Sequence, residues 1–269
     1  MERQKTKIFN IHKIKDGLKQ ALQDEVAQES SFSIFLNDQK IVSLMCTPQD
    51  QKYLAIGFLF SEGLIQSREE IEKILFNSKE EQVKVITKRK RKIPKAFLED
   101  KAYISGCGRG ESFKRIEDLG FLEDVLINLE FTLSIDEIEK LMKEFELRSI
   151  VFRSTGGTHS AALASKEKIL LFNEDIGRHN AVDKIIGESL IKKIPLQDKL
   201  IILSGRISSD ILIKAWRAKI NLIVSRSAPT SLAVEIAQKL GTTIAGFVRG
   251  RRMNIYSYPM RIVITPQSK

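Results

Sequence analysis

The segment 169–186 reads ILLFNEDIGRHNAVDKII and joins an apolar run to a dense polar cluster. The apolar run 169–172 is typical of a buried strand. One helix face follows, made of Ala181, Val182, Ile185 and Ile186. Seven of the eleven side chains in 174–184 can carry charge or form hydrogen bonds, which a plain surface turn does not need. The cluster therefore indicates either a ligand site or a structural network of helix caps and salt bridges.

Three other segments repeat this change from an apolar run to a small, polar loop. The expected strands are 148–153, 199–203 and 222–224, and the loops after them read STGGTH, SGRISS and SRSAPT. The last two loops precede helical apolar stripes, and a final strand is expected at 244–248. Strands that alternate with helices of about ten residues predict βαβ units and a largely parallel sheet.

The three loops are expected to lie together. Successive parallel strands have their carboxyl ends along one edge, so the loops at Thr155, Ser204 and Ser225 should face one crevice. Their small residues let backbone N–H groups approach a ligand, and two of them open helices whose N-termini favour anions. Formal charge is added by Arg153, Arg206 and Arg226. We interpret the loops as a phosphate cradle; ordinary Gly- and Ser-rich turns are the alternative.

His179 lies four residues from both Asp175 and Asp183. Either carboxylate could make it a proton shuttle or an orienting donor, and a satisfied structural histidine is the alternative. The chain has three histidines and two separated cysteines, without zinc-ligand spacing. It also lacks a Walker loop, a dinucleotide-binding glycine motif and a G-x-S-x-G motif. No metal site is expected.

The N-terminal part shows weaker patterns. Residues 1–24 are polar and basic and are predicted to form a tail or a peripheral helix. A strand pair is expected at 33–36 and 40–45, turning at Asn37-Asp38. Thr47 is expected to cap a helix that ends at Gly63, and Ser67 to open a second short helix.

Two further signals precede the loop-rich part. The run Lys88–Lys92 has five adjacent cations; we interpret it as a solvated hairpin tip, because no flanking aromatic residues are available to stack nucleic-acid bases. Ser134 and Glu137 predict a capping box. The helix that they open has an apolar stripe of Ile135, Ile138, Leu141, Met142 and Phe145.

Composition limits the function classes. The chain has 269 residues, 42% of them hydrophobic, and a formal net charge of +10, which favours an anionic partner. Its longest apolar stretch, 54–60, has seven residues, whereas a membrane helix needs about 20. No secretory signal is expected, and two cysteines are too few for a disulfide framework, so a cytoplasmic protein is predicted.

The two cysteines lie in different surroundings. Cys46 lies in a sequence typical of a core. Cys107 is flanked by glycines in ISGCGRGE (104–111), close to Arg109. A neighbouring cation increases the thiolate fraction of an ordinary thiol with a pKa of about 8.5. Cys107 is therefore predicted to be an exposed, activated thiol suited to covalent transfer; an idle thiol is the alternative.

Taken together, these motifs resemble the FdhD family, the formate dehydrogenase accessory sulfurtransferases. The matching segments are Thr47-Pro48, GFLFSEG (57–63), Cys107-Gly108, TGGTH (155–159), EDIGRHNAVDK (174–184), SGR (204–206), SAPT (227–230), FVR (247–249), IYS (255–257) and RI (261–262). They span about residues 29–262 in family order. The family's fuller loop is C-G-x-C-G, and Gly110 stands here in place of its second cysteine.

The resemblance implies an α/β fold: a cytidine deaminase-like three-layer domain without zinc, plus a smaller α/β domain. We expect a basic tail at 1–24, the smaller part at 25–115 and the deaminase-like domain at 116–269. It also implies that Cys107 carries a persulfide taken from a cysteine desulfurase. The sulfur then passes to the molybdenum cofactor, bis-molybdopterin guanine dinucleotide (bis-MGD), before that cofactor enters the formate dehydrogenase catalytic subunit.

The expected cofactor-binding residues combine the cradle with the family's C-terminal stretch. They are Gly156, Gly157, His159, Asp175, Arg178, His179, Ser204, Gly205, Arg206, Ser227, Phe247, Val248, Arg249, Gly250, Arg251 and Arg252. The cofactor would be cargo, and a guanine nucleotide such as GDP could mimic it. A homodimer is expected, without nucleic acid or membrane partners. A non-catalytic chaperone that binds bis-MGD for insertion is the alternative, because the second cysteine is missing.

Overall fold

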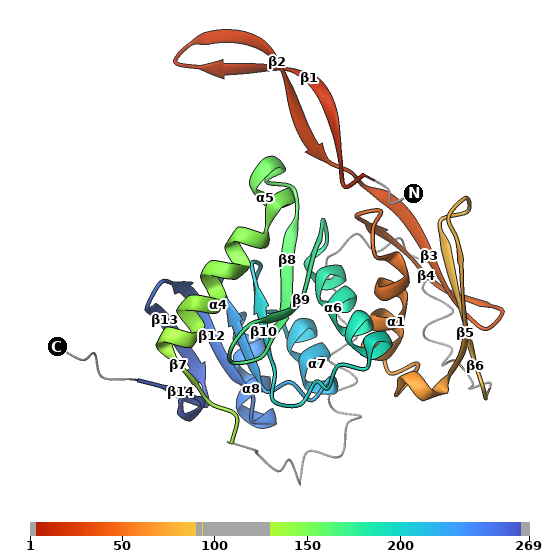
Figure 1. Cartoon of the computed structure of the whole chain (residues 1–269), viewed down its shortest axis with the longest axis vertical. Coiled ribbons are helices and arrows are strands. Elements are labelled where there is room, and N and C mark those ends of the chain that lie inside the picture. Colours follow the sequence, from red (N-terminus) through yellow and green to blue (C-terminus); the bar gives the residue numbers. More distant parts are fainter. Residues whose placement is uncertain (1–3, 90–92, 94–129, 265–269) are drawn as a thin grey trace.

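The computed structural model describes residues 4–89, 93 and 130–264, and its main part is a six-stranded sheet in the order β13-β12-β11-β10-β8-β9 (Figure 1). The strands are β8 (His159–Ala164), β9 (Ile169–Asp175), β10 (Leu200–Leu203), β11 (Leu222–Ser225), β12 (Thr243–Arg249) and β13 (Arg252–Ser257). A further short pair joins β7 (Leu133–Ser134) to β14 (Ile262–Val263) after the 3₁₀ turn Pro259–Arg261.

The prediction of a largely parallel sheet is wrong. Among the described strands of this six-stranded sheet, only β10, β11 and β12 pair in parallel, whereas β8 with β10, β8 with β9, and β12 with β13 are antiparallel. Short turns join β8 to β9 and β12 to β13, which leaves no room for a crossover helix and makes these pairs antiparallel. Because β8 lies between β9 and β10 and runs opposite to both, its pair with β10 is antiparallel as well.

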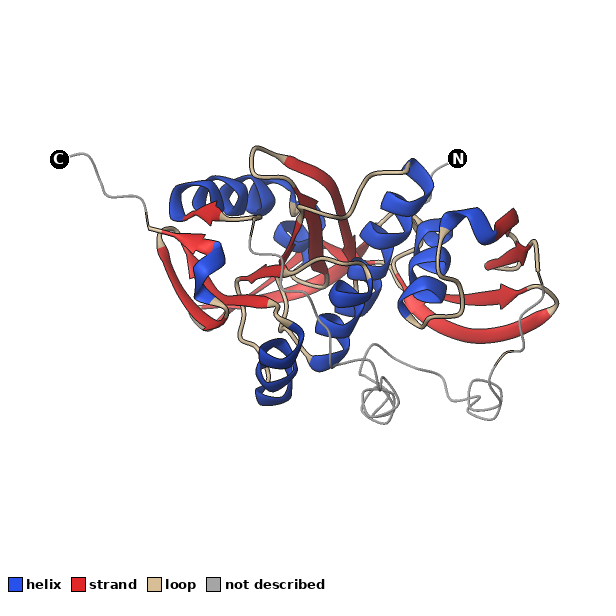
Figure 2. Ribbon diagram, turned by 90° about the horizontal axis from the view of Figure 1, so that it is seen from below, coloured by secondary structure: helices blue, strands red, loops and turns tan. Residues whose placement is uncertain are grey.

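Helices cover both faces of this sheet, giving three layers (Figure 2). The helix α4 (Ile135–Arg148) packs on one face, and α6 (Arg178–Lys192), α7 (Ser209–Arg217) and α8 (Ser231–Leu240) pack on the other. Alternate strand residues serve the two cores: Leu163 and Ile201 face α6–α8, and Ala162 and Ile202 face α4. The expected three layers are therefore present; the likeness to cytidine deaminases stays a prediction.

A second sheet, in the order β4-β3-β6-β5, forms the smaller part with helix α1. Its elements are β3 (Ser30–Leu36), β4 (Gln39–Cys46), α1 (Gln51–Ser61), the 3₁₀ turn Arg68–Glu70, β5 (Ile71–Asn77) and β6 (Gln82–Thr87). The strand pair predicted around Asn37-Asp38 is confirmed. The expected boundary between the two parts, 115/116, lies outside the described residues.

The two parts meet where α1 crosses α6 at very short range. A Cβ atom at Gly57 would lie 1.8 Å from the backbone oxygen of Asp183, and one at Gly187 would lie 2.0 Å from that of Tyr53. Only glycine permits this approach. The crossing joins the smaller part directly to the helix that begins within the polar cluster.

The prediction for residues 1–24 is wrong. They contribute to a two-stranded hairpin, β1 (Thr6–Lys15) and β2 (Leu18–Ala27), which projects from the body as an arm (Figure 1). Its turn is Asp16-Gly17, with φ of 50° and 78°. An Asp-Gly pair is a strong hairpin signal, because both central positions of such a turn need positive φ.

Two predicted helix starts are also wrong. Thr47 does not cap α1, whose N-cap Asp50 makes no side-chain capping bond; the hydroxyl of Thr47 instead accepts a bond from the Ile176 N–H. After Ser67 only a 3₁₀ turn forms, because the following apolar residues pair as β5 with β6. The capping box of Ser134 and Glu137 is confirmed at the start of α4.

The expected strand at 148–153 is a short helix, α5 (Ile150–Thr155). A distant side chain explains the difference: the Glu174 carboxylate accepts the N–H bonds of Val151 and Phe152 at 3.0 and 2.8 Å. That carboxylate satisfies two of the N–H groups that a helix start leaves open. Tertiary contact therefore overrides the strand preference of the sequence Ile150-Val151-Phe152.

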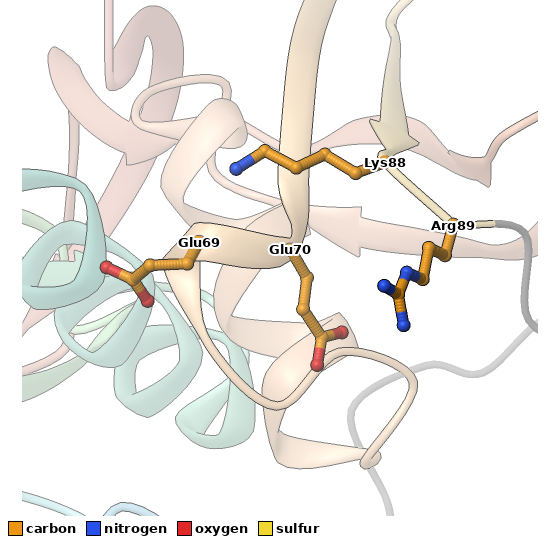
Figure 3. Close-up of a pocket in the computed structure, with 4 residues that line it drawn as sticks. All are labelled: Glu69, Glu70, Lys88 and Arg89. Carbon is orange, nitrogen blue, oxygen red and sulfur yellow. The ribbon is translucent and has the colours of Figure 1, made fainter.

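Only Lys88 and Arg89 of the basic run lie among the described residues. They line a small pocket together with Glu69 and Glu70, and the side chains of Glu70 and Arg89 extend to the same side (Figure 3). No described helix has the length and apolar character needed to cross a membrane.

Candidate functional site

The candidate site lies at the edge of the six-stranded sheet where β9, β10, β11 and β12 end, which we call the carboxyl edge. Because β8 runs antiparallel, its first residues meet the last residues of β10: the Ser204 N–H donates to Ser160 O, and the Ser204 hydroxyl accepts from the Ser160 N–H at 2.9 Å. The loop 156–158 therefore reaches the same edge as expected, although no strand precedes it.

The loops after β10, β11 and β12 are bonded to one another. The Ser225 hydroxyl donates to Gly205 O at 2.7 Å, and the Arg226 N–H donates to Leu203 O. The Phe247 N–H donates to Ser227 O at 3.1 Å. These bonds use backbone and hydroxyl groups at the ends of the strands. The segments that they join therefore lie side by side along the carboxyl edge.

Three residues of the polar cluster, Asp175, Asp183 and Lys184, are buried and structural, and we call them its inner half. Asp175 has no exposed surface and pairs with the buried Lys184 at 2.7 Å. Its other bonds come from the N–H groups of Thr47 and Gly177 and from the Asn180 amide. Asp175 therefore lies beneath the carboxyl edge, where its carboxylate holds the loop that begins α6.

A second buried ion pair involves Asp183, the residue that precedes Lys184 on α6. Asp183 accepts bonds from Lys214 of α7 at 2.8 and 2.9 Å and from the Ser61 hydroxyl at 2.7 Å. Burial raises the pKa of Asp183, while Lys214 and Ser61 oppose that rise. The ammonium of Lys214 also lies 5.7 Å from the Phe58 ring centroid. This pair connects α6, α7 and α1.

Two other residues of the cluster, Arg178 and His179, lie at the carboxyl edge, and we call them its outer half. His159 and Arg178 both approach Gly205, since a Cβ there would lie 3.1 Å from His159 Nδ1 and 3.5 Å from Arg178 Cβ. Burial and the charges of Arg178 and Arg206 lower the pKa of His159, against a smaller opposing effect of Asp175. Arg206 is exposed, and the buried Arg178 Nε has no hydrogen-bond partner among the described atoms.

His179 contacts different partners from those predicted. Its Nε2 lies 3.3 Å from the Ser208 hydroxyl and 4.0 Å from the Asp210 carboxylate. Neither Asp175 nor Asp183 contacts its ring, because both carboxylates face the buried side of α6.

Two helix N-termini at this edge are open. The N-caps of α6 and α7, Gly177 and Ser208, make no side-chain capping bond, whereas Thr230 caps α8. Uncapped first-turn N–H groups favour an anion. Asp210 is an acidic residue in the first turn of α7, and Arg178 and Arg206 supply two cations at the same edge. The cations and the open N-termini suit a phosphate group.

The C-terminal stretch divides between two faces. Phe247 is 43% exposed, and Arg249 donates to the backbone oxygen of Arg226 at 2.6 Å. Burial and neighbouring Arg226 lower the pKa of Arg249. Arg226 itself pairs with Glu146, and Arg251 pairs with Asp136 at the start of α4. Val248 is buried in the core, and Gly250 and Arg252 are exposed.

The two cysteines can be compared only in part, because Cys107 lies outside the described residues. Cys46 is buried without exposed surface, and burial together with the Asp175 carboxylate raises its pKa to about 12. A thiol in this state is inert near neutral pH. In the described ranges, no three His, Cys, Asp or Glu side chains gather as a metal site would require.

Comparisons with known proteins agree along nearly the whole chain. A family model described as the FdhD/NarQ family matches residues 27–263. The chain is 36% identical over 252 residues to the sulfur carrier protein FdhD of Bacillus pumilus, covering 94% of this chain and 95% of that protein. It is 38% identical over 247 residues to the protein of the same name from Listeria monocytogenes serotype 4b, covering 92% and 95%.

The fold has a solved counterpart. A crystal structure from Desulfotalea psychrophila, provisionally assigned as a formate dehydrogenase accessory protein, superposes with a TM-score of 0.81 at 28% identity. The alignment covers 97% of this chain and 100% of that one.

Proposed function

This chain belongs to the FdhD/NarQ family, and from that premise we propose that it is a sulfur carrier that delivers persulfide sulfur to bis-MGD for formate dehydrogenase. Cys107 is the proposed carrier, a cysteine desulfurase the donor and the formate dehydrogenase catalytic subunit the receiver of the finished cofactor. The relatives are named as sulfur carriers. The cytoplasm is the proposed location, since a free thiol nucleophile needs a reducing compartment.

The loading step balances without an added oxidant. The Cys107 thiolate attacks the outer sulfur of the cysteine persulfide on the desulfurase. A new S–S bond forms at Cys107, the S–S bond of the donor breaks, and the donor cysteine leaves as a thiolate. One thiol suffices for this exchange, and Cys46 is not available as a second one because its pKa is raised to about 12.

The anion site at the carboxyl edge is the observation that carries the proposal for the cargo. Arg178, the first residue of α6, has a buried Nε without a hydrogen-bond partner among the described atoms, and the N-caps of α6 and α7 make no side-chain capping bond. The exposed Arg206 and Arg249 extend the positive surface along the edge. A dinucleotide cofactor carries several phosphates, and guanidinium groups bind phosphate in a bidentate manner. GDP is the corresponding probe.

Mass spectrometry tests the carrier role most directly. After incubation with a cysteine desulfurase and free cysteine, the Cys107 peptide should gain the mass of one sulfur atom, and Cys107→Ala should gain none. The same variant should abolish sulfur transfer while it retains GDP binding. An unmodified Cys107 beside an active, bound desulfurase would reject the carrier role.

That rejection would favour the non-catalytic chaperone, for which the missing second cysteine is the motivating observation. A chaperone would bind bis-MGD through the same edge, and its Cys107→Ala variant would still support formate dehydrogenase maturation. If the chain is a sulfur carrier, the Cys107→Ala variant would not support maturation.

The arm supports the proposed homodimer. A two-stranded hairpin is at best marginally stable in water, yet this one exposes five large apolar side chains: Ile8, Phe9, Ile14, Leu18 and Val26. Helix α5, which β2 contacts, adds exposed Ile150 and Phe152. Two adjacent apolar surfaces on one chain can cover each other around a two-fold axis.

Sedimentation tests this assignment. The wild-type chain should sediment as a dimer, and Phe9→Asp with Leu18→Asp should shift it to a monomer. Lys13→Asp with Lys19→Asp places acidic residues on the same arm and should stay dimeric. A monomeric wild type would contradict the homodimer.

A further inference from the structure

A groove of about 420 Å³ lies at the opposite end of the six-stranded sheet, where β10 and β11 begin. We call it the amino-edge groove. It is bounded by the 3₁₀ turn Arg68–Glu70, by residues 193–197 and by residues 217–219. No residue of the carboxyl edge lines it.

Its lining combines apolar and cationic side chains. The apolar residues include Phe60, Leu190, Ile194 and Leu196. Four cations, Arg68, Lys193, Arg217 and Lys219, stand against one carboxylate, Glu69. The lining therefore carries a net charge of about +3 over an apolar base.

The cations fall into two kinds. Arg68 and Arg217 donate to the backbone oxygens of Ile71 and Ser61, at 3.0 and 2.8 Å. Lys193 and Lys219 are exposed, and neither ammonium makes an ion pair at contact distance among the residues that the structure describes. Local hydrogen bonds, and behind them the charge of Lys193, lower the pKa of Glu69 across the groove. The two lysines are therefore the charges available to an incoming partner.

The groove does not suit a small anion. A site for a small ligand usually has a few polar groups that point at the ligand. The buried hydroxyl in this groove, that of Ser189, is not available for that role because it donates to Ile186 O within its own helix. Mobile lysines around an apolar base instead suit an acidic protein segment: the apolar area supplies binding energy, and the charges guide association.

The position of the groove relates it to the carrier cysteine. The Lys88 N–H donates to Glu70 O at 2.9 Å, so the chain leaves the described part at Arg89 beside the turn that borders the groove (Figure 3). Cys107 follows eighteen residues later in the sequence. A protein bound at the groove leaves the carboxyl edge open to the cofactor.

We propose that the amino-edge groove binds an acidic segment, with at least one bulky apolar side chain, of the protein that donates sulfur to this chain. The inference rests on the proposed carrier function. It assigns the donor and the cofactor to opposite ends of one sheet.

A charge-reversal experiment tests it with a cysteine desulfurase as the probe. Lys193→Glu with Lys219→Glu should weaken desulfurase affinity by about tenfold or more. The rate of Cys107 persulfide formation at subsaturating desulfurase should fall by the same factor. GDP binding should stay unchanged. The matched control is Lys140→Glu with Lys239→Glu, which changes the net charge equally at exposed helix positions away from the groove.

The outcomes separate the two proposals. Unchanged affinity in the groove variant, or an equal loss in the control, would overturn the groove assignment while the carrier function stands. A wild-type chain that neither binds the desulfurase nor acquires sulfur would overturn both. Ile194→Asp provides a second variant, which should weaken binding through the apolar base without changing either lysine.

Discussion

The inner and outer halves of the cluster 174–184 contain the same kinds of residue but do different things. The inner carboxylates, Asp175 and Asp183, are buried and each pairs with a buried lysine. On the outer half, Arg178 has a buried Nε without a hydrogen-bond partner among the described atoms, and His179 contacts Ser208 and Asp210. The course of helix α6 separates the two halves. Asp183 lies against α1 of the smaller part, whereas Arg178 lies at the carboxyl edge beside Gly205.

The comparison teaches that residue type alone does not distinguish a binding group from a structural one. The structural interpretation of the cluster is confirmed for the inner half, and the ligand-site interpretation stays a prediction for the outer half. Burying an ion pair costs desolvation that only a fixed geometry offsets. The inner half therefore predicts losses of stability on mutation, and the outer half predicts losses of binding.

The largest expected effect is on stability, from Lys214→Met. The change leaves Asp183 buried without its cation, which should lower the free energy of unfolding by about 3–5 kcal/mol. Urea unfolding measures it. Adding Asp183→Leu should recover much of the loss, since both charges are then gone. A loss below about 1 kcal/mol would show that this pair does not hold the two parts together.

A smaller effect is expected from Arg206→Ala, now on binding. Arg206 is exposed, so stability should change by less than about 0.5 kcal/mol. Loss of one charged hydrogen bond to phosphate, about 1.5–3 kcal/mol, should weaken GDP binding by about tenfold or more. Calorimetric titration measures it, with Lys168→Ala as an exposed control. Unchanged GDP affinity in both Arg206→Ala and Arg178→Ala would remove the outer half from the cofactor site.

The smallest effect concerns pH. Burial, Arg178 and Arg206 lower the pKa of His159 in the folded chain, so the unfolded chain binds this proton more tightly. The free energy of unfolding should therefore fall as pH drops through the unfolded value of about 6.5. His159→Gln should lose less stability over that range. Equal pH dependence in the two proteins would contradict the placement of His159 among these cations.

The meeting of the three loops at one edge was predicted better than the strand directions around them. The loops at Ser204 and Ser225 meet at one edge as expected, because β10 and β11 are parallel. The loop at Gly156 reaches the same edge for another reason, the antiparallel pairing of β8 with β10. Small residues and cations marked these loops locally, whereas strand direction depended on long-range pairing.

The errors have two different causes. The arm was missed although Asp16-Gly17 is a local hairpin signal, so closer attention to turn chemistry would have found it. Helix α5 was beyond local reasoning, because Glu174, more than twenty residues away, satisfies its first N–H groups.

The sequence by itself determined the layered α/β architecture, the capping box of α4 and the loops that form the carboxyl edge, because these depend on periodicity and on short-range backbone chemistry. Only the tertiary structure decided which charges of the cluster are buried and which are presented. It also decided that His179 meets Ser208 and Asp210 rather than Asp175 or Asp183. Those outcomes depend on the close crossing of α1 and α6, and packing between distant helices has no signature in local spacing.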